Sequence, residues 1–267
     1  MEKYLDPLRS IMADTSSAIL EIYQQDFSVF EKDDKSPLTE ADLVANKIIT
    51  AGLKEISDFS ILSEEGKDIS WDERKNWQQY WLVDPIDGTK EFIKKNGEFT
   101  VNIALIDNGV PVLGVVTVPA RAVSYIGIQG KGAWKENANG VCTDLAVNPS
   151  PISGWKVIGS RSHNSESALA LAKLLPESEF VSMGSSLKLC SVAEGKADIY
   201  PRFGPTSEWD TAAAQAVVEA AGGMVINLDL TPLRYNTKES LLNPYFVVCS
   251  EINELWSGFL ENLQQSY

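Results

Sequence analysis

Two aspartates three positions apart are the first residues of this sequence whose spacing could support chemistry. Asp84 and Asp87 stand in WLVDPIDGTKEF, residues 81–92, directly after three apolar residues of an expected strand. Pro85 and Gly88 favour a sharp turn there, so the two carboxylates should converge just beyond the strand. Taken alone, the pair is equally compatible with an Asx-type turn, in which each aspartate bonds its own backbone.

Acidic side chains also stand at the ends of three other expected elements. These are Glu64 and Glu65 after a short apolar run, Asp210 at the start of a helix, and Asp42 in a capping box. Each has an ordinary structural explanation, because Asp210 can complement a helix dipole and Asp42 can cap its own helix. Carboxylates from four element ends are nevertheless what an oxygen-ligand site for Mg²⁺ requires.

Other kinds of active site find little support among the residues. A single histidine in the whole chain argues against a zinc site. The absence of a GxxxxGK[ST] sequence excludes a P-loop. His163 stands in a polar segment after an expected strand, where the alternative to a binding role is an ordinary surface residue. For Lys188 and Arg202 the alternative is ordinary surface charge.

The composition limits partners and location. The formal net charge of −14 disfavours binding to nucleic acid or to an anionic membrane surface. Three scattered cysteines without a CxxC pair predict reduced thiols in a cytoplasmic protein. The first residues lack the apolar core of a signal peptide, and no apolar run approaches the roughly 18 residues of a membrane span.

The first half must hold most of these acids, and its periodicity predicts two helices and a mainly antiparallel sheet. Helical spacing runs over 7–25, and Thr39 to Asp42 resembles a capping box that opens a second helix. Short strands are expected at 59–62 and 80–83, and a polar surface excursion at 67–79. Asp107-Asn108-Gly109 is typical of a hairpin turn, followed by a further strand within 122–134.

The second half alternates between strands and helices, which predicts an α/β layer. The segment 148–154, rich in Pro, Ser and Asn, is the expected boundary between domains 1–150 and 151–267. Beyond it we expect strands at 155–160, 179–183, 197–202 and 245–250, and helices at 165–175, 185–195, 208–223 and 251–263.

Three segments resemble the signatures of the inositol monophosphatase superfamily. They are Ser63-Glu64-Glu65, the run from Asp84 to Thr89, and Trp209-Asp210-Thr211. The resemblance extends from Lys35 to the last expected strand. Within the superfamily, the segments GSRSH, GSSLK and YPRFGP are closest to the bacterial 3′(2′),5′-bisphosphate nucleotidases; they span residues 159–163, 184–188 and 200–205.

The resemblance implies a fold and a metal centre. The fold is the sugar-phosphatase type of layered αβαβα sandwich, an α/β (α+β) protein, with a mainly antiparallel sheet in the first half, a smaller mixed sheet in the second, and the site between them. Two or three Mg²⁺ ions would promote in-line attack by water. The implied ligands are Glu64, Asp84, the Ile86 carbonyl, Asp87 and Asp210. Glu65 would act from outside this set or through water.

The resemblance also implies roles in catalysis and substrate binding. Glu64, Thr89 and Asp42 are the expected catalytic residues, with Thr89 orienting the attacking water and Asp42 holding the Thr89 hydroxyl. Lys35 and Thr39 fall in the family's N-terminal loop. The substrate-binding set is Gly88, Thr89, Ser160, His163, Ser185, Lys188, Arg202 and Asp210. In this set His163 lies against adenine, and Ser185, Lys188 and Arg202 bind the 5′-phosphate.

The implied reaction is removal of the 3′-phosphate from 3′-phosphoadenosine 5′-phosphate to give AMP, in sulfur metabolism. Its sulfated form, 3′-phosphoadenylyl sulfate, is a further expected substrate, and lithium sensitivity follows from the family. One alternative is an inositol monophosphatase or another sugar-phosphate phosphatase of the superfamily. An alternative of another class is a non-catalytic nucleotide- or Mg²⁺-binding protein. A homodimer and a loose association with the inner membrane are also compatible with the resemblance.

Overall fold

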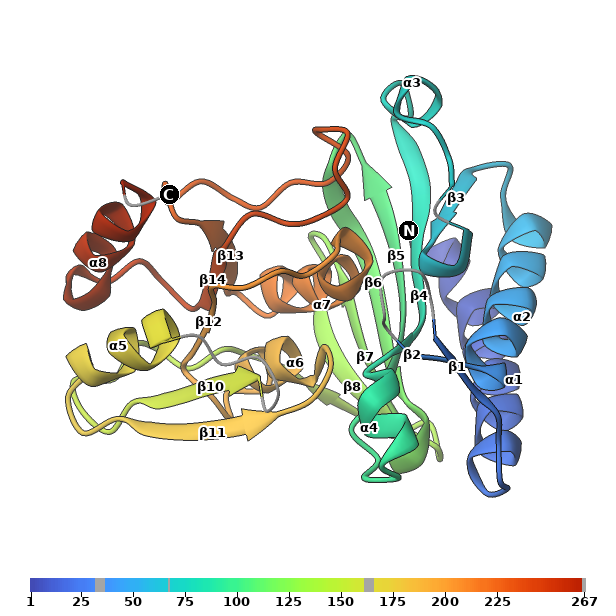
Figure 1. Ribbon diagram of the computed structural model, residues 1–267, viewed down its shortest axis with the longest axis horizontal. Coiled ribbons are helices and arrows are strands. Elements are labelled where there is room, and N and C mark those ends of the chain that lie inside the picture. Colours follow the sequence, from blue (N-terminus) through green and yellow to red (C-terminus); the bar gives the residue numbers. More distant parts are fainter. Residues whose placement is uncertain (32–36, 67, 161–165, 266–267) are drawn as a thin grey trace.

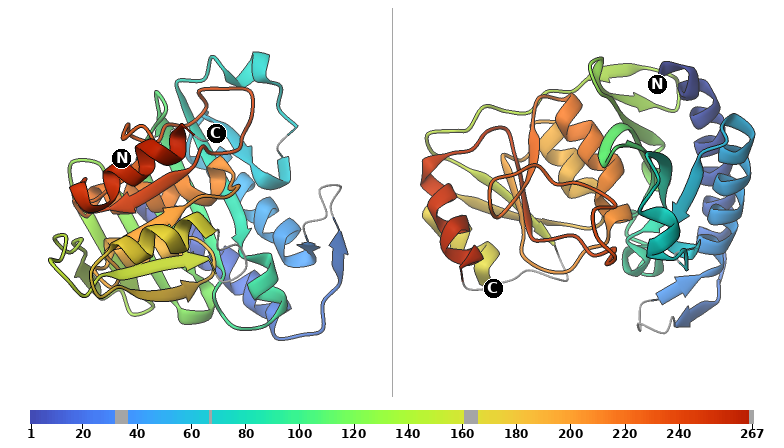
Figure 2. Two further views of the ribbon diagram at one scale, coloured as in Figure 1. Left: turned by 60° about the vertical axis from the view of Figure 1, so that its left-hand side comes forward. Right: turned by 90° about the horizontal axis from the view of Figure 1, so that it is seen from above.

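The computed structural model of the chain describes residues 1–31, 37–66, 68–160 and 166–265. Five layers follow one another across the molecule, as Figure 1 and the right-hand view of Figure 2 show. Two helices cover the outer face of the larger sheet, two lie between the sheets, and two cover the outer face of the smaller sheet. In that order these are α1 (Leu5–Tyr23), α2 (Glu40–Ile56), α6 (Leu187–Ala193), α7 (Glu208–Ala220), α5 (Glu166–Leu174) and α8 (Glu254–Gln264). The expected αβαβα sandwich is confirmed.

The larger sheet has seven strands in the order of the sequence, from β3 to β9. All neighbours are antiparallel except β3 and β4, which are parallel. The strands are β3 (Ser60–Ser63), β4 (Gln79–Asp87), β5 (Thr100–Asp107), β6 (Val110–Val118), β7 (Val123–Ile128), β8 (Gly132–Asn137) and β9 (Cys142–Asp144). Most residues of β4, β5 and β6 are buried, because helices cover both faces of the sheet.

The smaller sheet is mixed, as the alternation in the second half predicts. Its order is β11-β10-β12-β14-β13, with β10 parallel to both of its neighbours and β14 antiparallel to both of its own. The strands are β10 (Lys156–Ser160), β11 (Glu179–Met183), β12 (Ile199–Arg202), β13 (Met224–Asn227) and β14 (Phe246–Cys249). An unpredicted two-stranded ribbon pairs β1 (Val29–Glu31) with β2 (Pro37–Thr39).

Short helices fill several connections. They are the 3₁₀ turns η1 (Glu2–Tyr4), η2 (Glu64–Gly66) and η3 (Pro119–Arg121), and the helices α3 (Trp71–Arg74) and α4 (Thr89–Ile93). The prediction that residues 67–79 form a surface excursion was wrong for Arg74, the last residue of α3, which is only 2% exposed. Within the described ranges, no helix has the length and apolar character needed to cross a membrane.

β4 differs from the prediction that the strand ends at Val83. It continues to Asp87, and its register with β5 shifts along the way. Asp84 pairs with Asn102 and Asp87 with Thr100, so β4 carries one more residue than β5 between these two pairs. This extra residue is a β-bulge, which bends the strand and re-aims its side chains. Pro85 is tolerated there because bulges interrupt the ladder of hydrogen bonds.

The middle helix α7 lies directly on the larger sheet, at two glycines. A Cβ atom on Gly114 of β6 would stand 2.1 Å from the carbonyl oxygen of Ala213. A Cβ atom on Gly127 of β7 would stand 2.5 Å from that of Ala216. Backbone therefore meets backbone, and this contact places the first turn of α7 beside the end of β4. The last strand of the larger sheet ends at Asp144, and the first strand of the smaller sheet begins at Lys156. α7 comes after that boundary in the sequence, yet it packs on the sheet of the first half.

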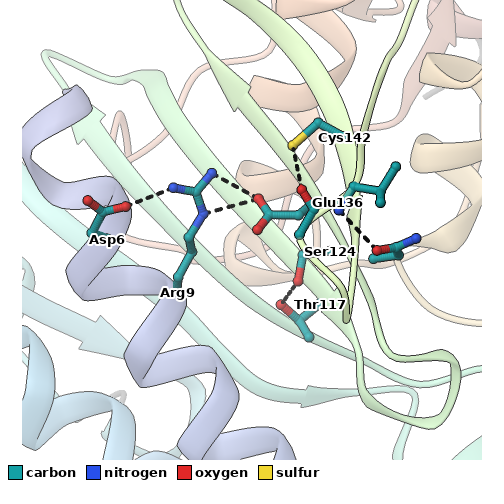
Figure 3. Close-up of polar contacts among 9 residues, drawn as sticks. Asp6, Arg9, Thr117, Ser124, Glu136 and Cys142 are labelled. Carbon is teal, nitrogen blue, oxygen red and sulfur yellow. Dashed lines mark hydrogen bonds and ion pairs between the residues drawn. The ribbon is translucent and has the colours of Figure 1, made fainter.

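At the opposite face of the larger sheet, α1 is tied to β8 by an ion pair (Figure 3). Two guanidinium nitrogens of Arg9 donate to Glu136 at 3.0 and 2.9 Å, while a third donates to Asp6 at 2.8 Å. Nearby, the hydroxyl oxygens of Thr117 and Ser124 lie 2.8 Å apart across β6 and β7. The contacts of Arg9 with Glu136 therefore join the N-terminal helix to the sheet on the face away from α7.

Candidate metal centre and substrate pocket

Three of the predicted acidic residues gather at one point. Asp84, Asp87 and Asp210 each present a carboxylate oxygen within 4.8 Å of the others. The first two come from the bulged end of β4, and Asp210 comes from the first turn of α7. Its carboxylate also accepts the backbone N–H of Ser207 at 2.8 Å, in a capping box that fixes the side chain.

Asp84 is the acid of the cluster whose buried carboxylate lacks hydrogen-bond donors in the part of the chain that the structure describes. It is 1% exposed, and neither carboxylate oxygen has a hydrogen-bond partner among the described residues. Burial raises its pKa, and the neighbouring Glu64, Asp87 and Asp210 raise it further. The pKa of Asp210 is raised by burial and then by Asp87 and Glu64. A buried carboxylate without donors is costly to ionise, and a cation held by its oxygens offsets that cost. The donor set, made of carboxylates, suits Mg²⁺ or Ca²⁺ better than zinc.

Glu64 lies at the start of η2 and lines the same pocket as Asp87 and Asp210. Behind it, Asp42 is 2% exposed and accepts two hydrogen bonds from Thr39, at 2.8 Å from the backbone N–H and 2.6 Å from the hydroxyl. Burial raises the pKa of Asp42 to about 6, although the bonds from Thr39 oppose the shift. The capping box predicted at this helix is therefore formed.

The predicted hydrogen bond between Thr89 and Asp42 is not formed in this structure. The hydroxyl of Thr89 donates instead to the carbonyl oxygen of Ile86, at 3.4 Å. Asp42 is occupied by Thr39, as described above. The carbonyl oxygen that accepts this hydrogen bond is the one that the resemblance predicts as a ligand.

Sequence reasoning missed Ser186 and Asn102, which join the parts of the cluster. The hydroxyl oxygen of Ser186 lies 2.7 Å from Oδ2 of Asp87 and 2.6 Å from the carbonyl oxygen of Asp210. The side-chain amide of Asn102 on β5 donates to the same hydroxyl at 2.9 Å. A signal was available, since Asn102 is a polar residue in the middle of an apolar strand.

The turn before α6 is held by the first half of the chain. The backbone N–H of Gly184 donates to Oε2 of Glu98 at 2.9 Å. A Cβ atom on Gly184 would stand 2.8 Å from Cγ of Glu91, so only glycine fits this approach. The next residue, Ser185, adopts a left-handed conformation with φ of 47°. This tight turn delivers Ser185, Ser186 and Lys188 to the cluster.

A cavity of about 300 Å³ is lined both by acids of the cluster and by the cations Lys188 and Arg202. Lys188 and Arg202 are 6% and 8% exposed. Lys188 donates to the carbonyl oxygen of Ser185 and lies 5.6 Å from the centre of the Tyr200 ring; Arg202 donates to the carbonyl oxygen of Pro205 at 2.6 Å. Burial lowers the pKa of Lys188 to about 8, with Arg202 adding to the decrease and Asp87 opposing it. Both are buried groups facing the cavity, and the alternative of ordinary surface charge is excluded for them.

Most of the predicted site residues therefore share one cavity. Its lining includes Glu64, Asp87, Gly88, Thr89, Ser160, Ser185, Lys188, Arg202 and Asp210. Asp84 and Ile86 lie behind the lining, on β4. Lys35 and His163, together with the segment around His163, lie outside the described residues.

Comparisons with known proteins agree with this arrangement. A profile of the inositol monophosphatase family matches residues 1–261. The 3′(2′),5′-bisphosphate nucleotidase CysQ of Escherichia coli strain K12 is 47% identical over 249 residues, which cover 91% of this chain and 98% of that protein. The protein of the same name from Haemophilus influenzae is 35% identical over 267 residues, 97% of each chain.

Solved structures give the same result. The crystal structure of CysQ from Bacteroides thetaiotaomicron, described as a bacterial member of the inositol monophosphatase family, is 43% identical to this chain. It matches with a TM-score of 0.80 over 91% of this chain and 95% of its own. An inositol monophosphatase from Anabaena matches with a TM-score of 0.75 over 100% of this chain and 96% of its own, at 22% identity, and supports the fold alone.

Proposed function

The chain belongs to the inositol monophosphatase family, a family of phosphatases, and we propose that it is a 3′(2′),5′-bisphosphate nucleotidase. It removes the 3′-phosphate of 3′-phosphoadenosine 5′-phosphate to give AMP. The observation that carries this proposal is a single cavity lined both by carboxylates and by two buried cations, Lys188 and Arg202. Such a cavity suits a substrate with two phosphates, one to be hydrolysed and one to be held.

The carboxylates would hold two or three Mg²⁺ ions. Glu64, Asp84, the Ile86 carbonyl, Asp87 and Asp210 are the proposed ligands, and the unpartnered oxygens of Asp84 are the observation that favours them. Bound there, Mg²⁺ supplies charge neutralisation and acidifies a water molecule near neutral pH. The family is dependent on metal; the identity of the metal and the number of ions are part of the proposal.

The protein residues orient the reactants. Gly88 is the left-handed N-cap of α4, and its backbone N–H and that of Thr89 stand beside the acids. These amides would donate to the phosphoryl oxygens. The Thr89 hydroxyl, once released from Ile86, would accept or donate to the attacking water, while Glu64 would take a proton from it. Asp42 would act behind Glu64 through Thr39 rather than by direct contact with Thr89.

The two cations would recognise the 5′-phosphate. A guanidinium offers paired donors to phosphate oxygens, so Arg202 is the specific contact and Lys188 is the point charge. Ser185 would add a hydroxyl donor. We assign the adenine to Ser160 and His163. Of these two residues, Ser160 belongs to the described lining of the cavity. Three free thiols, at Cys142, Cys190 and Cys249, favour a reaction in the cytoplasm. The proposed substrate places the reaction in sulfur metabolism. A homodimer stays a prediction, which sedimentation analysis can test.

A substrate panel tests the proposal. Initial rates of phosphate release are measured with Mg²⁺ on 3′-phosphoadenosine 5′-phosphate, inositol monophosphate and fructose 1,6-bisphosphate, and each is repeated with Li⁺. We expect kcat/KM to be highest by far for the bisphosphate nucleotide. A preference for inositol monophosphate would favour the family's other activity. Absence of activity on every substrate of the panel would favour a non-catalytic nucleotide-binding protein.

A further inference from the structure

A buried arginine of the first half reaches into the second half on the side of α7 away from the cavity. Arg74 is the last residue of α3, the short helix near the top of the view in Figure 1. Its guanidinium donates to the carbonyl oxygens of Lys238 and Glu239 in the loop between β13 and β14. The guanidinium donates to neutral oxygens and lies over the ring of Trp71, its charge interacts with the Glu208 carboxylate, and its Nε has no hydrogen-bond partner among the described residues.

Asn236 is the centre of this contact. Its side-chain oxygen accepts from Nη1 of Arg74 at 2.7 Å, and its side-chain nitrogen donates to the backbone carbonyl of Arg74 at 2.6 Å. Asn236 adopts a left-handed conformation with φ of 53°, which asparagine tolerates better than most residues. The two residues are therefore joined by a reciprocal pair of hydrogen bonds.

Glu208 holds the other side of Asn236. Glu208 is the first residue of α7, two positions before Asp210, and it is 1% exposed. Both of its carboxylate oxygens accept the backbone N–H of Asn236, at 3.1 and 3.0 Å. The same asparagine is thus hydrogen-bonded to a buried glutamate and to a buried arginine.

Backbone hydrogen bonds between the loop that holds Asn236 and the residues at and just before the start of α7 extend this contact to the N-cap of α7. The N–H of Glu208 donates to the carbonyl oxygen of Leu241, and the N–H of Asn243 donates to that of Thr206, both at 2.8 Å. Ser207 forms a β-bridge with Leu242, and Ser207 is also the residue whose N–H holds the carboxylate of Asp210. A continuous series of contacts therefore runs from α3 to the side chain of Asp210.

We propose that Arg74, Asn236 and Glu208 form a latch that positions Asp210 against Asp84 and Asp87. Four residues separate α3 from β4, which carries two of the acids at its far end, while the latched loop contacts the start of α7, which carries the third. The latch thereby fixes the separation of the two parts of the metal centre from behind. All three are positioning residues and none lines the cavity. This inference rests on the proposed metal centre.

The geometry distinguishes this role from general stabilisation of the fold. If the latch only stabilised the protein, its loss would lower the melting temperature and leave metal binding by the folded protein unchanged. If it positions Asp210, its loss weakens metal binding in protein that is still folded. Residues that support metal ligands from outside typically change metal affinity by about 10- to 100-fold when they are removed.

The test is Mg²⁺ binding by isothermal titration calorimetry, without substrate and well below each variant's melting temperature. Asn236→Gly removes both side-chain bonds to Arg74 and keeps the left-handed backbone accessible. Glu208→Ala removes the carboxylate that accepts the backbone N–H of Asn236, while Glu208→Gln retains an oxygen that can accept this N–H. Arg9→Ala is the control, because it deletes the ion pair of Figure 3 far from the acids.

We expect Asn236→Gly and Glu208→Ala to raise the Kd for Mg²⁺ by about tenfold or more. Glu208→Gln and Arg9→Ala should stay within about twofold of the unaltered protein, as expected for remote or conservative changes. Unchanged Kd values in folded Asn236→Gly and Glu208→Ala would overturn the latch, as would an equal loss in Arg9→Ala. If Asn236→Gly does not fold, the comparison of Glu208→Ala with Glu208→Gln decides. Absence of Mg²⁺ binding by the unaltered protein would instead contradict the proposed metal centre.

Discussion

The hydroxyl oxygen of Ser186 lies 2.7 Å from Oδ2 of Asp87, so a residue from the turn before α6 fixes a carboxylate at the end of β4. The same oxygen lies 2.6 Å from the carbonyl of Asp210 and accepts a bond from Asn102. One small side chain therefore connects three segments that are far apart in the sequence, and it does so at the point where the acids meet.

Replacement of this hydroxyl should reduce activity through the metal. We expect Ser186→Ala to lower kcat/KM for 3′-phosphoadenosine 5′-phosphate by about 10- to 100-fold at limiting Mg²⁺, because Asp87 loses its orienting partner. The control is Ser124→Ala, which removes a half-buried hydroxyl from the pair with Thr117 across β6 and β7. Steady-state rates over a range of Mg²⁺ concentrations measure the effect. Equal losses in both variants would show that Ser186 has no special role at the acids.

Asp84→Asn should abolish turnover and yet stabilise the protein in the absence of metal. The substitution removes a buried carboxyl group that has no hydrogen-bond partner among the described residues and whose ionisation Glu64, Asp87 and Asp210 oppose. Relief of an unpaired buried group is worth about 1–3 kcal/mol. Thermal unfolding in excess EDTA at pH 8 measures the change, and Asp144→Asn, on an exposed strand, is the control. A lower melting temperature for Asp84→Asn would contradict our account of this carboxylate.

Metal-free protein should lose stability as the pH rises from about 4 to about 8. Burial raises the folded-state pKa of Asp42 to about 6, and it raises those of Asp84 and Asp210 as well. Between the unfolded and folded pKa values the unfolded carboxyl groups ionise first, which favours unfolding. Mg²⁺ restores the ionised folded form, so its addition should raise the melting temperature more at pH 8 than at pH 5. A larger shift at pH 5 would contradict this linkage.

Lys188→Ala should impair recognition of the second phosphate specifically. We expect a much larger rise in KM for 3′-phosphoadenosine 5′-phosphate than for a nucleoside 3′-monophosphate, because only the former presents a 5′-phosphate to the two cations. Lys54→Ala, an exposed lysine of α2, serves as the control. KM values for both substrates give the answer. Equal losses on the two substrates would contradict a separate pocket for the 5′-phosphate.

The charge of Lys188 should also give this recognition a pH dependence. Its pKa is lowered to about 8, so in the protein without substrate the ammonium form is lost as the pH rises through that value. KM for the bisphosphate should therefore increase above about pH 8, and the increase should be absent in Lys188→Ala. A pH profile that is the same in both proteins would assign the effect to another group.

The layered sandwich was predicted from the resemblance to the inositol monophosphatase superfamily, whereas periodicity predicted the helices, the mainly antiparallel sheet of the first half and the α/β alternation of the second. Sequence patterns also predicted the acids, since Glu64, Asp84, Asp87 and Asp210 belong to distinctive segments. The end of β4 was mispredicted, because Pro85 and Gly88 are typical of turns and a β-bulge has no separate signature in one strand. The register that creates the bulge depends on β5, which lies elsewhere in the chain.

Residues that act through the backbone of distant segments could not be predicted. Arg74 was placed in a surface excursion because it stands among polar residues, but its partners are carbonyl oxygens of a loop more than 160 positions away. Ser186 stands beside Ser185 in the sequence, and nothing distinguishes the two until Asn102 and Asp87 are brought to one of them. The pairing of Asp42 with Thr39 rather than Thr89 was likewise decided by local capping geometry.

The contact of α7 with Gly114 and Gly127 limits how this protein can change. Any side chain at either glycine would push the helix, and Asp210 with it, off the sheet, so neither position can drift without loss of the acidic cluster. The distance between α7 and the larger sheet cannot change easily, because main-chain atoms of the two are in direct contact at both glycines. New substrate preferences must therefore arise in the loops and side chains around Lys188 and Arg202, while the spacing of the acids is inherited unchanged.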